Sequence, residues 1–169
     1  MDAMVEDLVT QWRDADDRQL QLQVVQPALV GLIDGTVSTL APIFAAAYLA
    51  GSHAALLVGI ATALGAAISM GLSEALSDDG TLSGRGSSLV RGLVTGAGTF
   101  IGGSLHSLPF LIHDVHTALP IAYVVVGCEL IVIALIRKRF QRVSLRTSLI
   151  QVTLGGVLVA FVGYAIGHG

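Results

Sequence analysis

The chain has 169 residues, of which 53% are hydrophobic and only 12% are charged. A soluble globular domain usually carries about a quarter charged residues, so this composition excludes an ordinary soluble fold and indicates a membrane protein. The formal net charge is −3 and no basic patch lies away from the expected membrane loops, which argues against a nucleic-acid partner.

The first 23 residues are mostly polar and acidic, and they contain no apolar core after a basic start, so we expect no cleavable signal peptide. Val5, Leu8, Val9 and Trp12 recur at helical spacing, which favours a short amphipathic helix at the inner membrane surface. A frayed polar arm explains the same residues equally well. We therefore divide the chain into a polar cytoplasmic arm, residues 1–23, and one membrane domain, residues 24–169.

Long apolar stretches then follow near residues 25–50, 54–76, 89–112, 118–136 and 148–167. A membrane-spanning helix needs about 20 predominantly apolar residues, so these stretches predict five transmembrane helices. We expect a kink at Pro42 and a very short turn near Gly51, which would make the first two helices antiparallel neighbours. Cys128 in the fourth stretch is expected to be a small buried hydrophobic residue.

The basic residues predict the orientation of the helices. All 9 Lys and Arg residues can be placed on one side of the membrane: before the first stretch, between the second and third, and between the fourth and fifth. Basic residues accumulate in short cytoplasmic loops, so we predict a cytoplasmic N-terminus and a periplasmic C-terminus. Because five helices enclose a wide path poorly, we expect this all-α membrane protein to form a homodimer with the path at the interface.

Several side chains in the apolar stretches can bind protons or metal. Asp34 lies roughly 10 Å from the inner face by helical rise, and Glu129 roughly 12 Å. Met70 and Glu74 lie at similar depth and share one face of the second helix. We expect no Lys or Arg at this depth, so the carboxylates must be neutralised by protons, water or a bound cation.

Each of these residues also has a purely structural explanation. Asp34 could hydrogen-bond Ser38 one turn later, and Met70 could simply fill space in the helix packing. Glu74 could reach cytoplasmic water, and Glu129 could be a protonated group bonded to a neighbouring helix.

The types of ligand narrow the choice of cation. Carboxylate oxygens beside a thioether, with no paired Cys and no His expected at this depth, favour ferrous iron or manganese over zinc or copper. Asp78 and Asp79 could attract cations to the inner mouth, or they could form a solvated turn. His106, near the outer end of the third helix, could belong to an exit relay for metal or protons, or be an ordinary loop residue.

Short motifs in the first three stretches are similar to a known family. They are Gly31-Leu32-Ile33-Asp34-Gly35, Ala67-Ile68-Ser69-Met70-Gly71, Ser73-Glu74-Ala75-Leu76-Ser77 and Gly98-Thr99-Phe100-Ile101-Gly102-Gly103. Over residues 24–167 the chain resembles the vacuolar iron transporter family, and most closely the membrane domain of bacterial membrane-bound ferritins.

The resemblance implies a five-helix homodimer that exports ferrous iron or manganese in exchange for protons, with Asp34 and Met70 lining the path. The chain departs from plant members at Thr62, where they carry an acidic residue, and in its short loop between the second and third helices, where they insert a metal-collecting domain. No ferritin-like domain is recognisable in residues 1–23. The metal-collecting function is therefore missing, or supplied by another chain such as a ferritin-like protein, or carried by a segment outside this sequence.

We therefore expect a multi-pass protein of the bacterial inner membrane that moves ferrous iron or manganese outward and holds no permanent cofactor. Metal would meet Asp78, Asp79 and Glu74 first, and protons from outside would reload Asp34 and Glu129. Two alternatives stay open: a membrane anchor or assembly partner for a ferritin-like protein, and a proton-coupled exporter of organic cations, which the aromatic content of 5% disfavours. We expect no enzyme, because no nucleophile and base, and no pair of aspartates, lie at matched depth.

Overall fold

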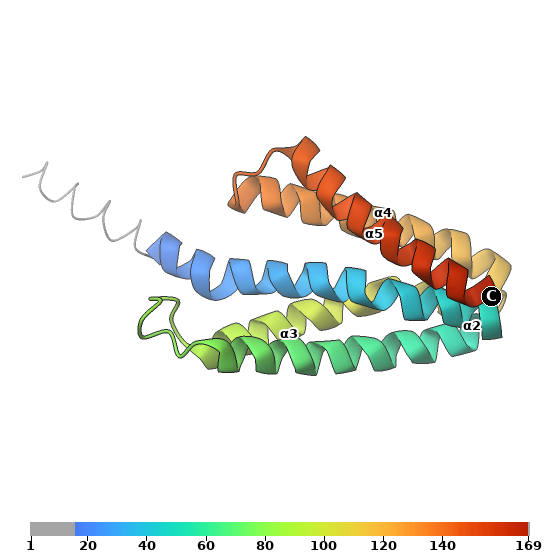
Figure 1. The fold of residues 1–169 in the computed structure, drawn as a ribbon, viewed down its shortest axis with the longest axis horizontal. Coiled ribbons are helices and arrows are strands. Elements are labelled where there is room, and N and C mark those ends of the chain that lie inside the picture. Colours follow the sequence, from blue (N-terminus) through green and yellow to red (C-terminus); the bar gives the residue numbers. More distant parts are fainter. Residues whose placement is uncertain (1–15, 169) are drawn as a thin grey trace, which may run out of the picture.

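The computed structural model describes residues 16–168 and consists of helices joined by short loops (Figure 1). The expected all-α fold is therefore confirmed. Most of the predicted N-terminal amphipathic helix falls on residues 1–15, which lie outside the described part. From Asp16 the chain is helical and continues through a π-helical segment, η1 (Gln21–Val25), directly into α2 (Gln26–Ser77).

Helix α2 folds back on itself at Gly51. This residue has φ 81° and ψ −172°, a conformation that glycine adopts readily because it has no Cβ. We call residues 26–50 the first arm and residues 52–77 the second arm; Figure 1 shows them running side by side in opposite directions. The predicted antiparallel pair is thus present, but the non-helical backbone inside α2 is at Gly51 and not at Pro42.

Helix α3 (Ser88–Leu105) packs along both arms of α2 through glycines on two of its faces. A Cβ on Gly98 would lie 2.5 Å from the Ala28 carbonyl oxygen of the first arm. A Cβ on Gly92 would lie 2.6 Å from the Gly71 carbonyl oxygen of the second arm. These backbones therefore approach closely, as small residues at four-residue spacing predict.

The third predicted helix is shorter than its apolar stretch. It ends at Leu105, and the chain continues through a 3₁₀ helix, η2 (Leu108–Leu111), where the prediction had extended an α-helix to residue 112. Pro109 explains the difference, because proline removes a helical N–H donor and its ring collides with the preceding turn.

Helices α4 (Val115–Phe140) and α5 (Leu145–His168) cover the side of the first arm opposite α3 and the second arm (Figure 1). A Cβ on Gly163 of α5 would lie 2.7 Å from the carbonyl oxygen of Ala41, so α5 also approaches the first arm closely. The first arm is therefore central, and its Leu40, Ile43 and Phe44 are fully buried in the core. Cys128 on α4 is exposed, which corrects the expectation that it is buried.

The outer surface of the bundle is apolar. In residues 16–168, three helices are long and apolar enough to cross a membrane: residues 16–77, α4 and α5. Leu57, Leu72 and Phe161 are among many large apolar side chains that are exposed, as expected of surfaces that face lipid. The chain is therefore a multi-pass membrane protein, and the number of five crossings stays a prediction.

The basic segments meet at one end of the bundle. The Gln21 side-chain amide donates to the Phe140 carbonyl oxygen at 3.0 Å, which joins the start of α2 to the end of α4. A Cβ on Gly86, in the loop after the second arm, would lie within 3.0 Å of the side chains of Gln19 and Gln23. This is the clustering that the orientation argument requires, although which end faces the cytoplasm stays a prediction.

Candidate ion site in the membrane domain

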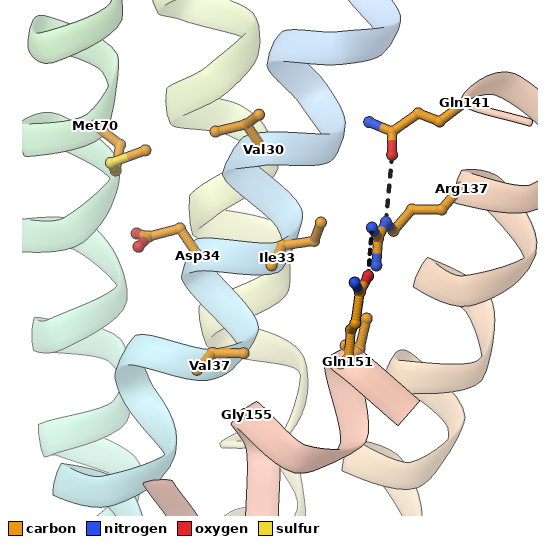
Figure 2. Close-up of a pocket in the computed structure, with 10 residues that line it drawn as sticks. Val30, Ile33, Asp34, Val37, Met70, Arg137, Gln141, Gln151 and Gly155 are labelled. Carbon is orange, nitrogen blue, oxygen red and sulfur yellow. Dashed lines mark hydrogen bonds between the residues drawn. The ribbon is translucent and has the colours of Figure 1, made fainter. Parts of the chain in front are cut away.

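A cavity of about 600 Å³ lies between the two arms of α2, the C-terminal end of α4 and the N-terminal half of α5. Figure 2 shows the side chains of Asp34, on the first arm, and Met70, on the second arm, pointing into the space between the arms. The other lining residues are Val30, Ile33, Val37, Arg137, Gln141, Gln151, Val152 and Gly155. Most of these are apolar, so Asp34 is the acidic group of a largely hydrophobic wall.

Asp34 is half-buried and has no partner. Nowhere in residues 16–168 does its carboxylate form a hydrogen bond or an ion pair, and Ser38, one turn further along, points to the exterior. The direction of Asp34 is set by its neighbours Gly31 and Gly35, because a Cβ on either would collide with the α3 backbone at Thr95 or Thr99. This close contact fixes the rotation of the first arm and leaves Asp34 facing the cavity.

Arg137 corrects the expectation that no basic residue lies near Asp34. It comes from the last turns of α4 and lines the same cavity. Its guanidinium donates to the side-chain oxygens of Gln141 at 3.2 Å and Gln151 at 3.0 Å (Figure 2). Two neutral amides therefore hold this cation at the opposite wall, and it does not neutralise Asp34.

Glu74 is also not the unpartnered carboxylate that the sequence suggested. Its Oε1 accepts from Nε of Arg91 at 2.8 Å and forms an ion pair with Arg85 at 2.9 Å. Arg91 is fully buried and donates further to the carbonyl oxygens of Gly86 at 2.9 Å and Asp78 at 2.6 Å. Glu74 and Arg91 thus fasten the loop onto the inner ends of α2 and α3, and Glu74 does not line the Asp34 cavity.

Asp78 and Asp79, in the loop after α2, form a solvated turn and not an entrance that would attract cations. The Ser83 hydroxyl and the Gly80 N–H both donate to Asp78, and these bonds hold the pKa of its carboxyl below the usual value. In the same way, the Thr81 N–H and hydroxyl donate to Asp79 at 2.9 and 2.8 Å and lower its pKa. Both carboxylates are therefore occupied by the loop itself.

Glu129 and His106 lie together in the core, so Glu129 has the partner on a neighbouring helix that one of its two explanations expected. Nδ1 of His106 is 3.0 Å from Oε2 of Glu129, and Nε2 is 2.9 Å from the Thr39 hydroxyl. His106 is fully buried, so it is not an ordinary loop residue, whereas a role in a relay stays a prediction. Glu129 has a histidine partner and does not share the Asp34 cavity.

The structure thus brings together two of the four predicted groups, Asp34 and Met70, and separates Glu74 and Glu129 from them. Residues 16–168 contain no cluster of three or more His, Cys, Asp or Glu side chains suited to a metal ion. Thr62 supplies no charge, and its hydroxyl donates to the Val58 carbonyl oxygen at 2.7 Å. One copy of the chain therefore offers a cation one carboxylate and one thioether in this cavity.

Sequence reasoning missed that Arg91 is fully buried and that Arg137 lines the cavity. Both were placed in polar connections because each lies next to the end of an apolar stretch. The clue for Arg91 was its position inside the third stretch, after the helix-capping Ser87, where an arginine must either reach water or find a carboxylate.

A helical bundle with a lipid-facing apolar surface defines an integral membrane protein, and its cavity holds a carboxylate beside a thioether. A model of the VIT family matches residues 75–168, more than half of the chain. The chain belongs to this family, the vacuolar iron transporters, which are membrane transporters of metal ions and not enzymes. No curated protein and no solved structure gave a match.

The matched segment begins at residue 75, after both Asp34 and Met70. The family match therefore establishes the class of protein, whereas the argument for these two ligands depends on their geometry. The more specific resemblance to bacterial membrane-bound ferritins stays a prediction.

Proposed function

We propose that this chain exports ferrous iron or manganese from the cytoplasm to the periplasm across the bacterial inner membrane, in exchange for protons. Asp34 and Met70 would bind the metal. The observation that carries the proposal is the unpaired Asp34 carboxylate, which shares a cavity of about 600 Å³ with the Met70 thioether in a chain of the VIT family.

The donor atoms support a transition metal. A carboxylate oxygen suits manganese and ferrous iron, and a thioether sulfur adds a soft ligand that magnesium and calcium do not favour. Such ions usually take about four to six donors, and one copy of the chain supplies two protein donors here. A homodimer that brings two copies of Asp34 and Met70 together, with water in the remaining positions, would complete the site.

The lack of a fixed partner for Asp34 supports proton exchange. A carboxylate in an apolar wall must be neutralised, and a proton or a cation can each do this. Arg137 could have formed a permanent ion pair, but Gln141 and Gln151 hold its guanidinium instead. Asp34 is therefore available to take up a proton when the metal leaves and to lose it when the next metal binds.

Transport by purified protein in liposomes with an imposed pH gradient tests the proposal, with iron, manganese, cobalt and zinc offered in turn. We expect metal flux that depends on the gradient, and Asp34→Asn should abolish it without changing the oligomeric mass. Met70→Leu should weaken ferrous iron transport more than manganese transport, because iron gains more from the sulfur. Asp79→Asn is the matched control, since it removes the same charge from a residue of the surface turn.

Flux that persists in Asp34→Asn would overturn the proposed site. No flux of any of the four metals with the wild-type chain would instead favour a membrane anchor for a ferritin-like protein. A monomeric mass for the transporting protein would contradict the shared site.

A further inference from the structure

Three buried side chains, Thr39, His106 and Glu129, form a hydrogen-bonded chain that the proposed metal site does not use. They come from the first arm of α2, the residue that caps the end of α3, and the middle of α4. His106 is fully buried, Thr39 is 1% exposed and Glu129 is 8% exposed. These hydrogen-bonded side chains therefore link three helices in the core, and they lie outside the cavity that Asp34 lines.

The hydrogen bonds limit where the protons can be. The Thr39 hydroxyl lies 2.9 Å from the Gly35 carbonyl oxygen, to which it can donate, and 2.9 Å from Nε2 of His106. When it donates to Gly35, its oxygen accepts from Nε2, which then carries a hydrogen. Nδ1 of His106 and Oε2 of Glu129, 3.0 Å apart, then need one further proton between them, on either atom.

In that arrangement, the pair of His106 and Glu129 holds one shared proton and has zero net charge. Oε1 of Glu129 is buried and, within the described chain, has no donor. An unbonded buried oxygen is tolerated far better on a neutral carboxylic acid than on a carboxylate. Removing the shared proton would leave one negative charge in the apolar core.

Within residues 16–168, no Lys or Arg pairs with His106 or Glu129 to compensate for that charge. Arg91 is on α3, fifteen residues and roughly 22 Å of helix before His106, and it is bound to Glu74. Arg137 is on α4, eight residues and roughly 12 Å beyond Glu129, and is held by two amides. Other titratable or charged side chains on the helices packed around the pair include Asp34, Tyr48 and His53 on α2, His116, Tyr123 and Cys128 on α4, and Arg146, Tyr164 and His168 on α5; η2 carries none.

A metal ion in the Asp34 cavity could supply the missing positive charge. Asp34 precedes Thr39 by five residues on the same helix, a rise of roughly 7.5 Å. A divalent ion adds two positive charges beside the Asp34 carboxylate. Relative to the same cavity with an ionised and empty site, this added charge favours loss of the proton from the neighbouring pair. Coupling of this kind is reciprocal, so reloading the pair with a proton weakens the binding of the metal.

We infer that the pair of His106 and Glu129 is a second proton site, which releases its shared proton when a divalent ion binds at Asp34 and recovers it when the ion leaves. The step breaks only the bond from that proton to Nδ1 or Oε2, and the proton passes to water. No electrons are transferred. The inference rests on the proposed function and deepens it, because each copy then exchanges protons at two places.

Proton release on adding Mn²⁺ to the purified full chain, in weakly buffered detergent solution with a pH indicator, tests the inference. At the starting pH at which the wild type releases most protons, Glu129→Gln and His106→Gln should bind Mn²⁺ but release about half as many protons per bound ion. Glu129→Asp keeps a carboxyl group and should restore part of the release. Ser148→Ala, which alters another buried hydroxyl without a partner, should behave like the wild type.

The outcomes separate this inference from the proposed function. Wild-type proton release in both Gln variants, with Mn²⁺ still bound, overturns the inference and leaves the Asp34 site intact. Equal Mn²⁺ binding by the wild type and Asp34→Asn overturns the proposed function itself. Should the Gln variants fail to fold, infrared difference spectra of ¹⁵N-histidine-labelled wild-type protein decide: Mn²⁺ should remove the signal of the proton-bound pair, and an unchanged spectrum contradicts the inference.

Discussion

Arg91 carries a fully buried guanidinium whose partners are a carboxylate and two backbone carbonyl oxygens. Arg91→Gln would leave Glu74 without this partner and the carbonyl oxygens of Asp78 and Gly86 without donors. Breaking a buried ion pair by removing one member typically costs about 3–5 kcal/mol. We therefore expect a large loss of stability, measured as a lower unfolding temperature in detergent.

Arg85 provides the matched comparison for this prediction. It pairs with the same Oε1 of Glu74, but its side chain is 29% exposed, so water can replace the lost contact. Arg85→Gln should cost roughly 0–1 kcal/mol, as is usual for ion pairs that water reaches. If the two variants unfold at the same temperature, burial of Arg91 is not what fastens the loop.

Asp78 makes the loop sensitive to acid. Its carboxyl has a lowered pKa because Ser83 and the Gly80 N–H donate to it, so it stabilises the folded loop at neutral pH. A group with a depressed folded-state pKa loses this contribution as pH falls through that pKa. We expect the loop to open below about pH 4, and to open at higher pH in Ser83→Ala.

Amide hydrogen exchange of residues 78–87, corrected for the intrinsic pH dependence, measures this opening. Leu82→Ala changes a fully exposed residue of the same loop and should leave the midpoint unchanged. A midpoint in Ser83→Ala equal to that of the wild type would contradict the role given to the Ser83 hydroxyl.

At this scale, the sequence predicted which acidic residues were unusual but not which of them have partners. Depth along each helix could be estimated from residue counts, and it placed Asp34 and Met70 correctly enough to share a cavity. The rotation of each helix could not be estimated, because the glycine contacts that set it appear only when helices pack. Rotation is what turns Glu74 toward Arg91 and Glu129 toward His106.

The packing of α3 against the first arm of α2 depends on glycines, which carry a hydrogen atom in place of a side chain. A Cβ on Gly35 would collide with the Thr99 carbonyl group and lie 2.9 Å from the Gly103 nitrogen. Gly35→Ala should therefore push the helices apart, at a cost of about 1–3 kcal/mol, as overpacking usually does. It should also reduce metal transport, because Asp34 is next in the chain.

Gly65→Ala on the second arm is the control, since a Cβ there has no atom within 4 Å. It should be neutral, or stabilising by up to about 1 kcal/mol through better helix propensity. Unfolding in detergent gives the stabilities, and liposome flux gives the activities. Equal stabilities for the two alanine variants would mean that α2 and α3 are less tightly apposed than described.

Helix positions followed well from hydropathy, and their ends followed less well. The stretch near 118–136 corresponds to α4 over Val115–Phe140, because the Asp114 carboxylate caps its first turn and the basic last turn remains helical. The apolar stretch that continues beyond α3 is not α-helical, because hydropathy does not register the backbone conflict at Pro109. Hydropathy therefore locates helices, whereas capping residues and prolines decide where they end.

For the molecule as a whole, the clustering of basic segments at one end predicts its orientation in the membrane. In a chain with Cys128→Ala, we expect Ser83→Cys to react with a membrane-impermeant thiol reagent only from the cytoplasmic side. His113→Cys, in the exposed connection before α4, should react only from the periplasmic side. Labelling of both positions from the same side would contradict the predicted topology.

The position of α3, in backbone contact with both arms of α2, has a consequence for alternating access. Backbone carbonyl groups lie directly against glycines where α3 contacts the two arms of α2. These contacts leave the three segments no room to slide or rotate past one another, so we expect them to stay fixed relative to one another. The cavity wall that carries Arg137 and Gln151 belongs to α4 and α5, which pack on the side of the first arm opposite α3. Under the proposed function, we therefore expect the cavity to open to one compartment and then to the other through movement of the end of α4 that bears Arg137, because α5 also contacts the first arm closely at Gly163.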